Sequence, residues 1–205
     1  MNLTDITARV LLASWFLFAA LGQWSKFRAE HGILAAPRLF AMMFLLLSVG
    51  LLIIRQPSWR KADGAGPRLT AFLGCFLFTL VIYLPASPPT VVQTVLAGIL
   101  ITVGYILSLT ALINLGRSFS VMAEARTLKT QGMYRYVRHP LYASEQVMIL
   151  GVMIQFFSVY ALALFLLQFY FQLRRMGNEE RVLSEAFPEY QAYSTRTRRM
   201  IPGIY

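Results

Sequence analysis

The sequence predicts an all-α polytopic membrane protein with about six transmembrane helices. Of its 205 residues, 57% are hydrophobic and only 14% are charged, a composition that is rare in soluble domains. Several apolar runs have about the 18 residues at which a segment is taken as a membrane helix. A single cysteine, Cys75, excludes an internal disulfide.

Four apolar segments precede the polar middle of the chain. We expect spans at 8–23, 39–54, 69–84 and 91–115. In the fourth segment, Gly98 and Gly104 are expected to allow close helix packing. The later apolar run 140–173 is too long for one span of about 20 residues, which predicts a helical hairpin that turns near 155–160. We therefore divide the chain into N-terminal helices, 1–113, and a C-terminal core, 114–205.

Lysine and arginine are distributed unevenly between the two sides. Six spans place both termini on one side, with 16 of the 19 basic residues, and leave Lys26, Arg28 and Arg38 on the other. Because basic loops stay in the cytoplasm, we expect both termini there and the protein in the cytoplasmic (inner) membrane. The net charge of +10 favours contact with anionic membrane lipids over nucleic acid, since the charges lie in short loops.

The segment 128–142 is the densest polar and aromatic stretch. Pro140 fits the first position of a helix, so Arg138 and His139 are expected at the mouth of a membrane helix, beside free N–H groups. Arg138 is either a snorkelling arginine or a ligand contact, and His139 either caps the helix or binds a ligand. No metal is expected, since His31 is predicted on the other side and there is no cysteine cluster.

Acidic residues at two places in the C-terminal part of the chain are candidate functional residues. Glu179 and Glu180 are either a solvated helix face, with an i,i+4 pair from Arg175 to Glu179, or two carboxylates that bind a ribose diol. Glu145 lies about one turn inside an apolar span, where an acid is a functional candidate by default. A purely structural Glu145 would instead form a hydrogen bond to a neighbouring helix.

The C-terminal tail, 174–205, is polar and is expected on the cytoplasmic side. Phe187, Tyr190 and Tyr193 recur every three residues, which predicts a short amphipathic helix at the membrane interface. Arg196 can bind a lipid phosphate or a substrate carboxylate. Neither a Ser-His-Asp order, a P-loop nor a Rossmann glycine pattern is present. These features predict a membrane enzyme or transporter with a cytoplasmic polar site.

Three motifs together resemble the isoprenylcysteine carboxyl methyltransferase family: GMYRYVRHPLY at 132–142, EERVL at 179–183, and EYQAYSTR at 189–196 with Ile201 and Pro202 after it. The resemblance covers about 114–202. It implies S-adenosylmethionine as the methyl donor, a cytoplasmic cofactor pocket and a lipophilic or prenylated acceptor. The implied cofactor-binding residues are Gly132, Tyr134, Val137, His139, Pro140, Tyr142, Glu179, Glu180 and Leu183.

The resemblance also implies that Arg138 and Arg196 are catalytic and orient an acceptor carboxylate. A carboxylate is ionised at pH 7 and needs no general base, so alignment and exclusion of water would suffice. We assign Glu145, Tyr190 and Tyr193 to the acceptor site. Glu145 stands where the family often has a small residue, which also favours an amine acceptor, as in a phospholipid N-methyltransferase. An NADPH-dependent lipid or sterol reductase is a further hypothesis, and a transporter or binding module is another.

Overall fold

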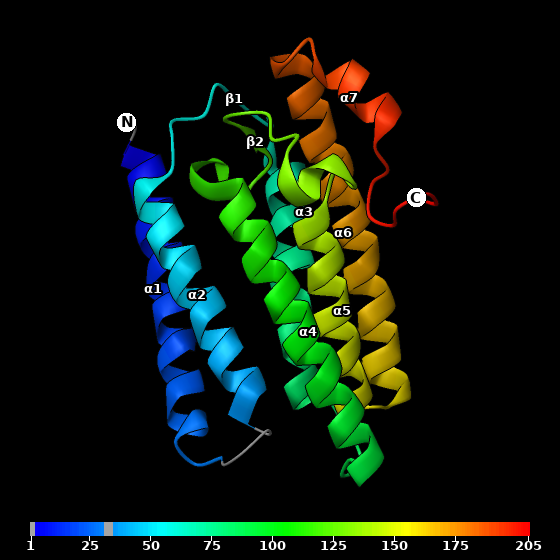
Figure 1. Cartoon of the computed structure of the whole chain (residues 1–205). Helices are drawn as coiled ribbons and strands as arrows, with labels where there is room; N and C mark the ends of the chain where they lie inside the picture. The colour runs from blue at the N-terminus through cyan, green and yellow to red at the C-terminus, as the bar shows by residue number, and fades with distance from the viewer. Residues whose placement is uncertain (1–2, 31–34) are drawn as a thin grey trace.

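Six long helical segments run side by side in the computed structural model, which describes residues 3–30 and 35–205 (Figure 1). They are α1 (Leu3–Phe27), α2 (Ala36–Ile54), α3 (Ala65–Phe76) with its 3-10 continuation η2 (Leu77–Tyr83), α4 (Val91–Leu115), α5 (Pro140–Gln155) and α6 (Val159–Ala186). A short helix, α7 (Tyr190–Arg196), follows α6. The expectation for His31 lies outside the described residues.

Among the described residues, four helical segments are long and apolar enough to cross a membrane: Asp5–Phe27, Ala36–Ile54, Ala65–Tyr83 and Val91–Ser118. The prediction of an all-α polytopic membrane protein is confirmed. The last two helices lie beside these four but are not among the candidate spans, because α5 has only 16 residues, with Glu145 among them, and the second half of α6 is polar. They form the predicted hairpin, which turns between Gln155 and Val159.

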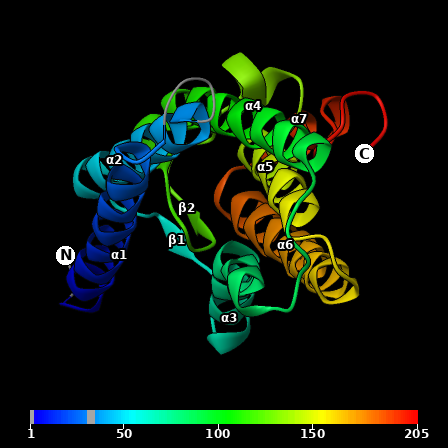
Figure 2. The same ribbon diagram turned by 90° about the horizontal axis from the view of Figure 1, so that it is seen from below.

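Neighbouring helices follow one another around an open arc. Viewed from below, α1 pairs with α2, α2 lies beside α4, and α5 and α6 follow (Figure 2). The arc ends with α3, which packs against α6 although the two are far apart in sequence. The predicted domain boundary at 113/114 falls in the last turn of α4 and stays a prediction.

The closest helix packing is between α4 and α5. A Cβ atom on Gly104 would lie 2.6 Å from the backbone nitrogen of Met148, so only glycine fits there. Ser108 on α4 donates a hydrogen bond to Ser144 on α5 at 2.9 Å between buried oxygens. The expectation of close packing is therefore confirmed at Gly104, whereas Gly98 has no neighbouring atom within 4 Å of an added Cβ.

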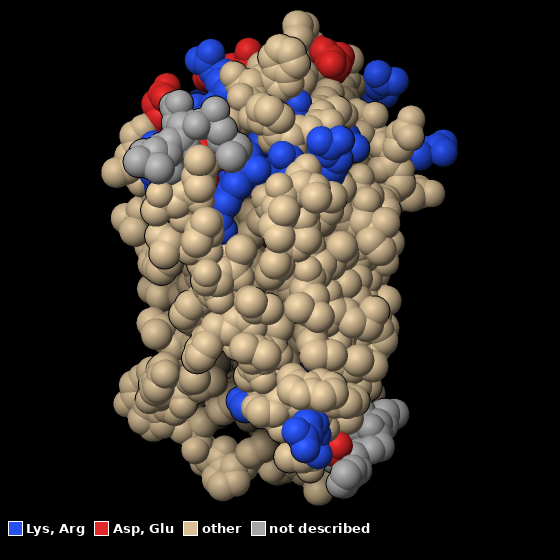
Figure 3. Space-filling model, turned by 90° about the vertical axis from the view of Figure 1, so that its left-hand side faces the viewer, with Lys and Arg blue, Asp and Glu red and all other residues tan. Residues whose placement is uncertain are grey.

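Charged side chains gather at the two ends of the bundle, and an uncharged band separates them (Figure 3). The richer end contains a short antiparallel ribbon, in which β1 (Arg60–Lys61) pairs with β2 (Glu124–Ala125). Sequence analysis did not predict this ribbon, because each strand has only two residues. The start of α1, the ribbon and α7 all lie at this end (Figure 1). We call it the polar end.

Candidate active site

Pro140 begins α5 as predicted, and the chain before it pairs with the C-terminal tail. The N–H groups of Arg138 and His139 donate to the carbonyl oxygens of Arg198 and Arg199 at 2.7 and 2.9 Å. Val137 forms a parallel bridge with Arg198. His139 makes no side-chain cap to α5, so the capping interpretation is not supported, and its buried ring turns toward α6 instead.

Glu180 on α6 contacts three basic side chains. Its carboxylate accepts hydrogen bonds from Arg138 Nε at 2.9 Å and from Arg199 Nη2 at 2.7 Å, and His139 Nε2 lies 3.2 Å away. Burial opposes ionisation of Glu180, but the hydrogen bonds from His139 and Arg199 and the nearby positive charges outweigh it. They lower its pKa to about 2. Glu180 therefore stays ionised and fixes the basic groups around it.

Glu179, the adjacent carboxylate, has a different environment. Its Oε2 accepts a hydrogen bond from the Tyr142 hydroxyl at 2.5 Å, and it forms no ion pair with any described residue. The Tyr142 ring stacks on His139, with centroids 5.2 Å apart. The predicted pair from Arg175 to Glu179 is not formed, because the Arg175 guanidinium lies over the Tyr142 ring, 4.4 Å from its centroid. Glu179 is thus free to meet a ligand.

Two adjoining depressions at the polar end, which we call the hollow, lie between these groups and the end of α4. Both are lined by Leu115, Glu124, Tyr134, Arg138, His139 and Glu179, among others. The larger has about 440 Å³ of empty space, a volume that includes its open mouth. Segments far apart in sequence therefore share one concave surface.

The structure brings eight of the predicted site residues to the hollow. These are Tyr134, Arg138, His139, Tyr142, Glu179, Leu183, Tyr190 and Tyr193. The two tyrosines of α7 are buried against each other rather than laid along the molecular surface, with ring centroids 6.0 Å apart. The Tyr193 hydroxyl donates to the carbonyl oxygen of Tyr134 at 2.7 Å, which fixes α7 to the wall.

Four further predicted residues lie behind that wall and support it. Gly132 has a φ of +63° and packs on Asn114, whose Oδ1 accepts the N–H of Met133 at 2.9 Å. Val137 and Pro140 are buried in the backbone turn before α5. Glu180 binds the basic groups described above. Whether any of these four touches a ligand stays a prediction.

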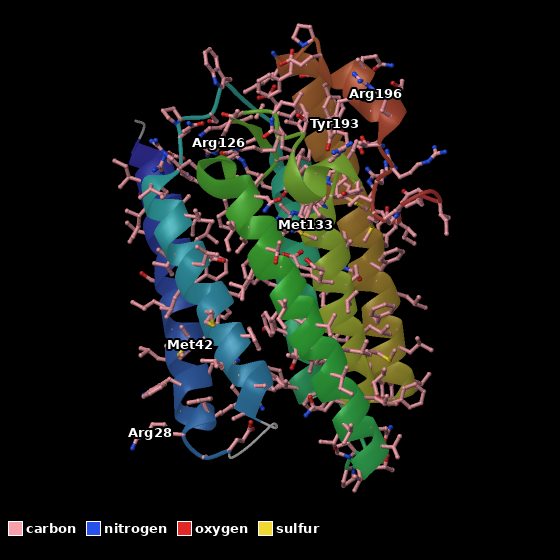
Figure 4. The ribbon with its side chains drawn as sticks, in the orientation of Figure 1. Arg28, Met42, Arg126, Met133, Tyr193 and Arg196 are labelled. Atoms are coloured by element: carbon pink, nitrogen blue, oxygen red, sulfur yellow. The ribbon has the colours of Figure 1, made fainter. Side chains whose placement is uncertain are left out.

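Glu145 and Arg196 do not line the hollow. Glu145 accepts a hydrogen bond from Gln172 on α6 at 2.9 Å, and Arg175 Nη1 lies 3.9 Å away, so the hydrogen bond to a neighbouring helix is present. Arg196 is exposed on the outer side of α7 (Figure 4), and its Nε donates to the carbonyl oxygen of Ala192 at 3.1 Å. Their assigned roles in binding the acceptor stay predictions.

Sequence analysis missed several lining residues, above all Glu124 and Arg126. Glu124 is the only acidic residue between Gly116 and His139, which is the signal that would have singled it out. Arg199 was expected to be able to bind a lipid phosphate or a substrate carboxylate, but its pairing with Glu180 was not predicted. Among the described residues, no group of three or more His, Cys, Asp or Glu side chains could hold a metal ion.

The structure is that of a polytopic helical membrane protein with a polar hollow at one end of its bundle. Residues 92–190 match the family model described as phospholipid methyltransferase. The match runs from the first turn of α4 to the start of α7 and covers 99 of the 205 residues. No individual curated protein matches the chain. The family match supports a membrane methyltransferase, and it covers most of the residues that form the hollow.

Proposed function

We propose that the protein transfers a methyl group from S-adenosylmethionine to a lipophilic acceptor at the cytoplasmic face of a membrane. One observation carries this proposal: residues of the segments 134–142 and 179–193 line a single hollow, and all of them except Tyr193 lie in the part of the chain, 92–190, that resembles methyltransferases. The excess of Lys and Arg at this end supports a cytoplasmic orientation with both termini on that side.

The chemistry of the hollow fits the methyl donor. S-adenosylmethionine carries a ribose diol, an amino acid end and a positive sulfonium, so it needs acceptors, donors and a nearby negative charge. Glu179 offers a carboxylate without a cationic partner, and Leu115 and Leu183 offer apolar surface. Two buried polar atoms on lining residues lack hydrogen-bond partners, the Tyr190 hydroxyl and Arg126 Nε. A polar ligand would satisfy both.

Each wall residue has a role that follows from its contacts. Tyr142 holds the Glu179 carboxylate in one orientation, and Glu179 can then accept hydrogen bonds from hydroxyl groups or attract the sulfonium. His139 and Arg138 are immobilised by Glu180, so they form a rigid part of the wall. When bound, S-adenosylmethionine supplies an activated methyl group, and the protein needs only to align the acceptor and exclude water.

The sequence favours a carboxylate acceptor, and Arg138 is the catalytic candidate that lines the hollow. A carboxylate is already nucleophilic at pH 7 and would need only orientation from Arg138. A phospholipid amine is the second candidate. Glu145 and the description of the matched family support it. An ammonium group must lose its proton before its lone pair can attack, and the Glu145 carboxylate is a group that can accept one.

Product chemistry separates the two acceptors. The purified protein would be incubated in detergent–lipid micelles with S-adenosylmethionine labelled in its methyl group, and with either phosphatidylethanolamine or an S-farnesyl cysteine derivative. Label that alkali releases as methanol identifies a methyl ester, whereas label that resists alkali identifies an N-methyl amine. A matched Glu179→Gln protein should lose binding of the donor.

The binding measurement also tests the proposal as a whole. We expect micromolar affinity for S-adenosylmethionine and none for NADPH. Affinity for NADPH alone would support a reductase, and the absence of binding for both would support a transporter or binding module. Either result would contradict the proposed function.

A further inference from the structure

We propose that Arg126 binds the α-carboxylate of S-adenosylmethionine, at the end of the hollow remote from α7. This inference rests on the proposed function and assigns a specific partner to the amino acid end of the methyl donor. The carboxylate is the only anionic group of that molecule. It therefore requires a cation in the hollow whose neighbouring carboxylates do not fully balance the local positive charge.

The position of Arg126 defines one end of the hollow. Arg126 and Tyr193 line the same concave surface, and in Figure 4 they lie apart from each other across the polar end. The lining includes Glu179 and the tyrosines of α7, and it also includes Arg126, Glu124 and Lys129. An elongated ligand can therefore place hydroxyl groups at Glu179 and a carboxylate at Arg126.

Arg126 belongs to a cluster with surplus positive charge, in which Arg55 and Arg126 are buried and Lys61 is half exposed. Its guanidinium donates to the Glu124 carboxylate and to the carbonyl oxygen of Gln56. Arg55 lies 2.7 Å from Asp5 and 4.0 Å from Glu124, and Lys61 lies 3.5 Å from Glu124. Three cations thus share two carboxylates, and Arg9 adds a fourth cation at Asp5. An arriving anion would lower the electrostatic cost of burying this surplus.

The guanidinium also has unused hydrogen-bonding capacity. Arg126 is only 2% exposed, and its Nε is buried without a hydrogen-bond partner. A buried unsatisfied donor is costly, and a bound carboxylate oxygen would satisfy it. Burial lowers the pKa of Arg55, and repulsion from Arg126 lowers it further. A lowered arginine pKa is the direction expected where positive charge is in excess.

The other cations of the hollow are less suitable. Arg138 already donates Nε to Glu180, and Nη1 to the carbonyl oxygens of Ser194 and Thr197 at 2.7 and 2.5 Å. Lys129 is only half-buried and has no fixed partner in the described chain, so water competes for its charge. Arg126 is held in place by Glu124 and is largely shielded from water, which strengthens its interaction with an anion.

The assignment gives the first two helices a function. Asp5 on α1 and Arg55 at the end of α2 brace Glu124, which in turn orients Arg126. Asp5, Arg55 and Lys61 all precede the segment that the family model matches. The N-terminal helices therefore help to form the donor site, although they do not line the hollow.

Decarboxylated S-adenosylmethionine provides the test, because it lacks only the carboxylate. Affinities for it and for S-adenosylmethionine would be measured by calorimetry with the full chain in detergent. We expect the wild-type protein to prefer the intact donor by about 10- to 100-fold, as for a charge-assisted hydrogen bond. In Arg126→Gln this preference should fall below about threefold, with unchanged affinity for the decarboxylated ligand. Lys129→Gln, the matched control, should retain it.

The outcomes separate this inference from the proposed function. Equal wild-type affinities for the two ligands overturn the inference, as does a full preference in Arg126→Gln or a preference lost in Lys129→Gln. Should Arg126→Gln fail to fold, Arg126→Met keeps most of the side-chain volume without the charge, and an undiminished preference in that variant overturns the inference. A wild-type protein that binds neither ligand overturns the proposed function and this assignment together.

Discussion

Arg138 and Glu180 are joined by a hydrogen bond of 2.9 Å between Nε and Oε1, although 42 residues separate them in sequence. The bond links the residue before α5 to the polar half of α6. Arg138 also donates to two carbonyl oxygens of the tail, at Ser194 and Thr197. One side chain therefore holds together three segments that line the hollow, and Glu180 fixes that side chain.

Glu180→Gln should destabilise the polar end of the molecule. The neutral amide cannot balance Arg138 and Arg199, so we expect a loss of about 2–4 kcal/mol in the free energy of unfolding. Denaturant unfolding in detergent measures it. Glu185→Gln is the control on the same helix, since Glu185 pairs with Arg60 at the exposed surface and should cost less than about 1 kcal/mol. Equal losses in the two variants would contradict the importance of Glu180.

The same carboxylate makes stability depend on acid pH. The pKa of Glu180 is about 2 in the folded protein, against 4.5 ordinarily, so protons bind the unfolded chain more readily. Its contribution is complete above about pH 4.5 and disappears as the pH falls toward about 2. The difference in unfolding free energy between wild type and Glu180→Gln should shrink across that window. A difference that is constant with pH would disprove the lowered pKa.

The two arginines assigned to catalysis should respond differently to substitution. Arg138 lines the hollow, so Arg138→Gln should lower methyl transfer at least 100-fold. Arg196 is exposed and bonded within its own helix, so Arg196→Ala should change the rate less than about threefold, as expected for a surface residue. Steady-state kinetics and donor affinity would be measured for both. A loss of activity in Arg196→Ala with intact donor affinity would support the catalytic role implied by the sequence.

Glu145→Gln tests whether Glu145 acts on the methyl acceptor. The amide keeps the volume of Glu145 and can still bond to Gln172, but it cannot accept a proton or attract a cation. With an amine acceptor we expect the rate to fall by about 10- to 100-fold and the affinity for S-adenosylmethionine to stay the same. Glu189→Gln, at an exposed position before α7, serves as the control. An unchanged rate with the amine would indicate that Glu145 is structural only.

The contact between α4 and α5 predicts opposite effects for two glycines of one helix. Gly104→Ala would place a methyl group against the Met148 backbone and should cost about 1–3 kcal/mol of stability. Gly98→Ala meets no atom within 4 Å, so it should be neutral or stabilising by less than about 1 kcal/mol. Thermal unfolding in the same detergent compares them. A destabilised Gly98→Ala would contradict this view of the packing.

Apolar patterning was sufficient to predict the bundle. The runs that became α1, α2, α3 with η2, and α4 are long and apolar, and Pro140 marks the start of α5 as expected. The ribbon between β1 and β2 could not be predicted, since strands of two residues carry no periodic signal. Its pairing depends on how α2, α3 and α4 are placed in space.

The candidate site could be predicted only in part, because motifs reveal residues that are close in sequence but not their partners on other elements. Local motifs singled out His139, Glu179 and Tyr142, which do lie together. Glu124 and Arg126 were missed because their importance comes from Asp5 and Arg55, more than 60 residues earlier in the chain. Arg175 was expected on a solvated face, but it is buried and donates to the carbonyl oxygen of Val121 at 2.9 Å. Its partners lie on other elements, and spacing along α6 does not reveal them.

The pairing of Arg138 and His139 with Arg198 and Arg199 also constrains the order of events during synthesis. Five of the six long helical segments have been translated before the ribosome reaches Glu179, and the backbone partners of the Arg-His-Pro turn follow still later. A nascent chain that stops before Arg198 can insert its apolar helices yet has no closed wall around the hollow. The site that we propose for the methyl donor is therefore complete only after membrane insertion is well advanced.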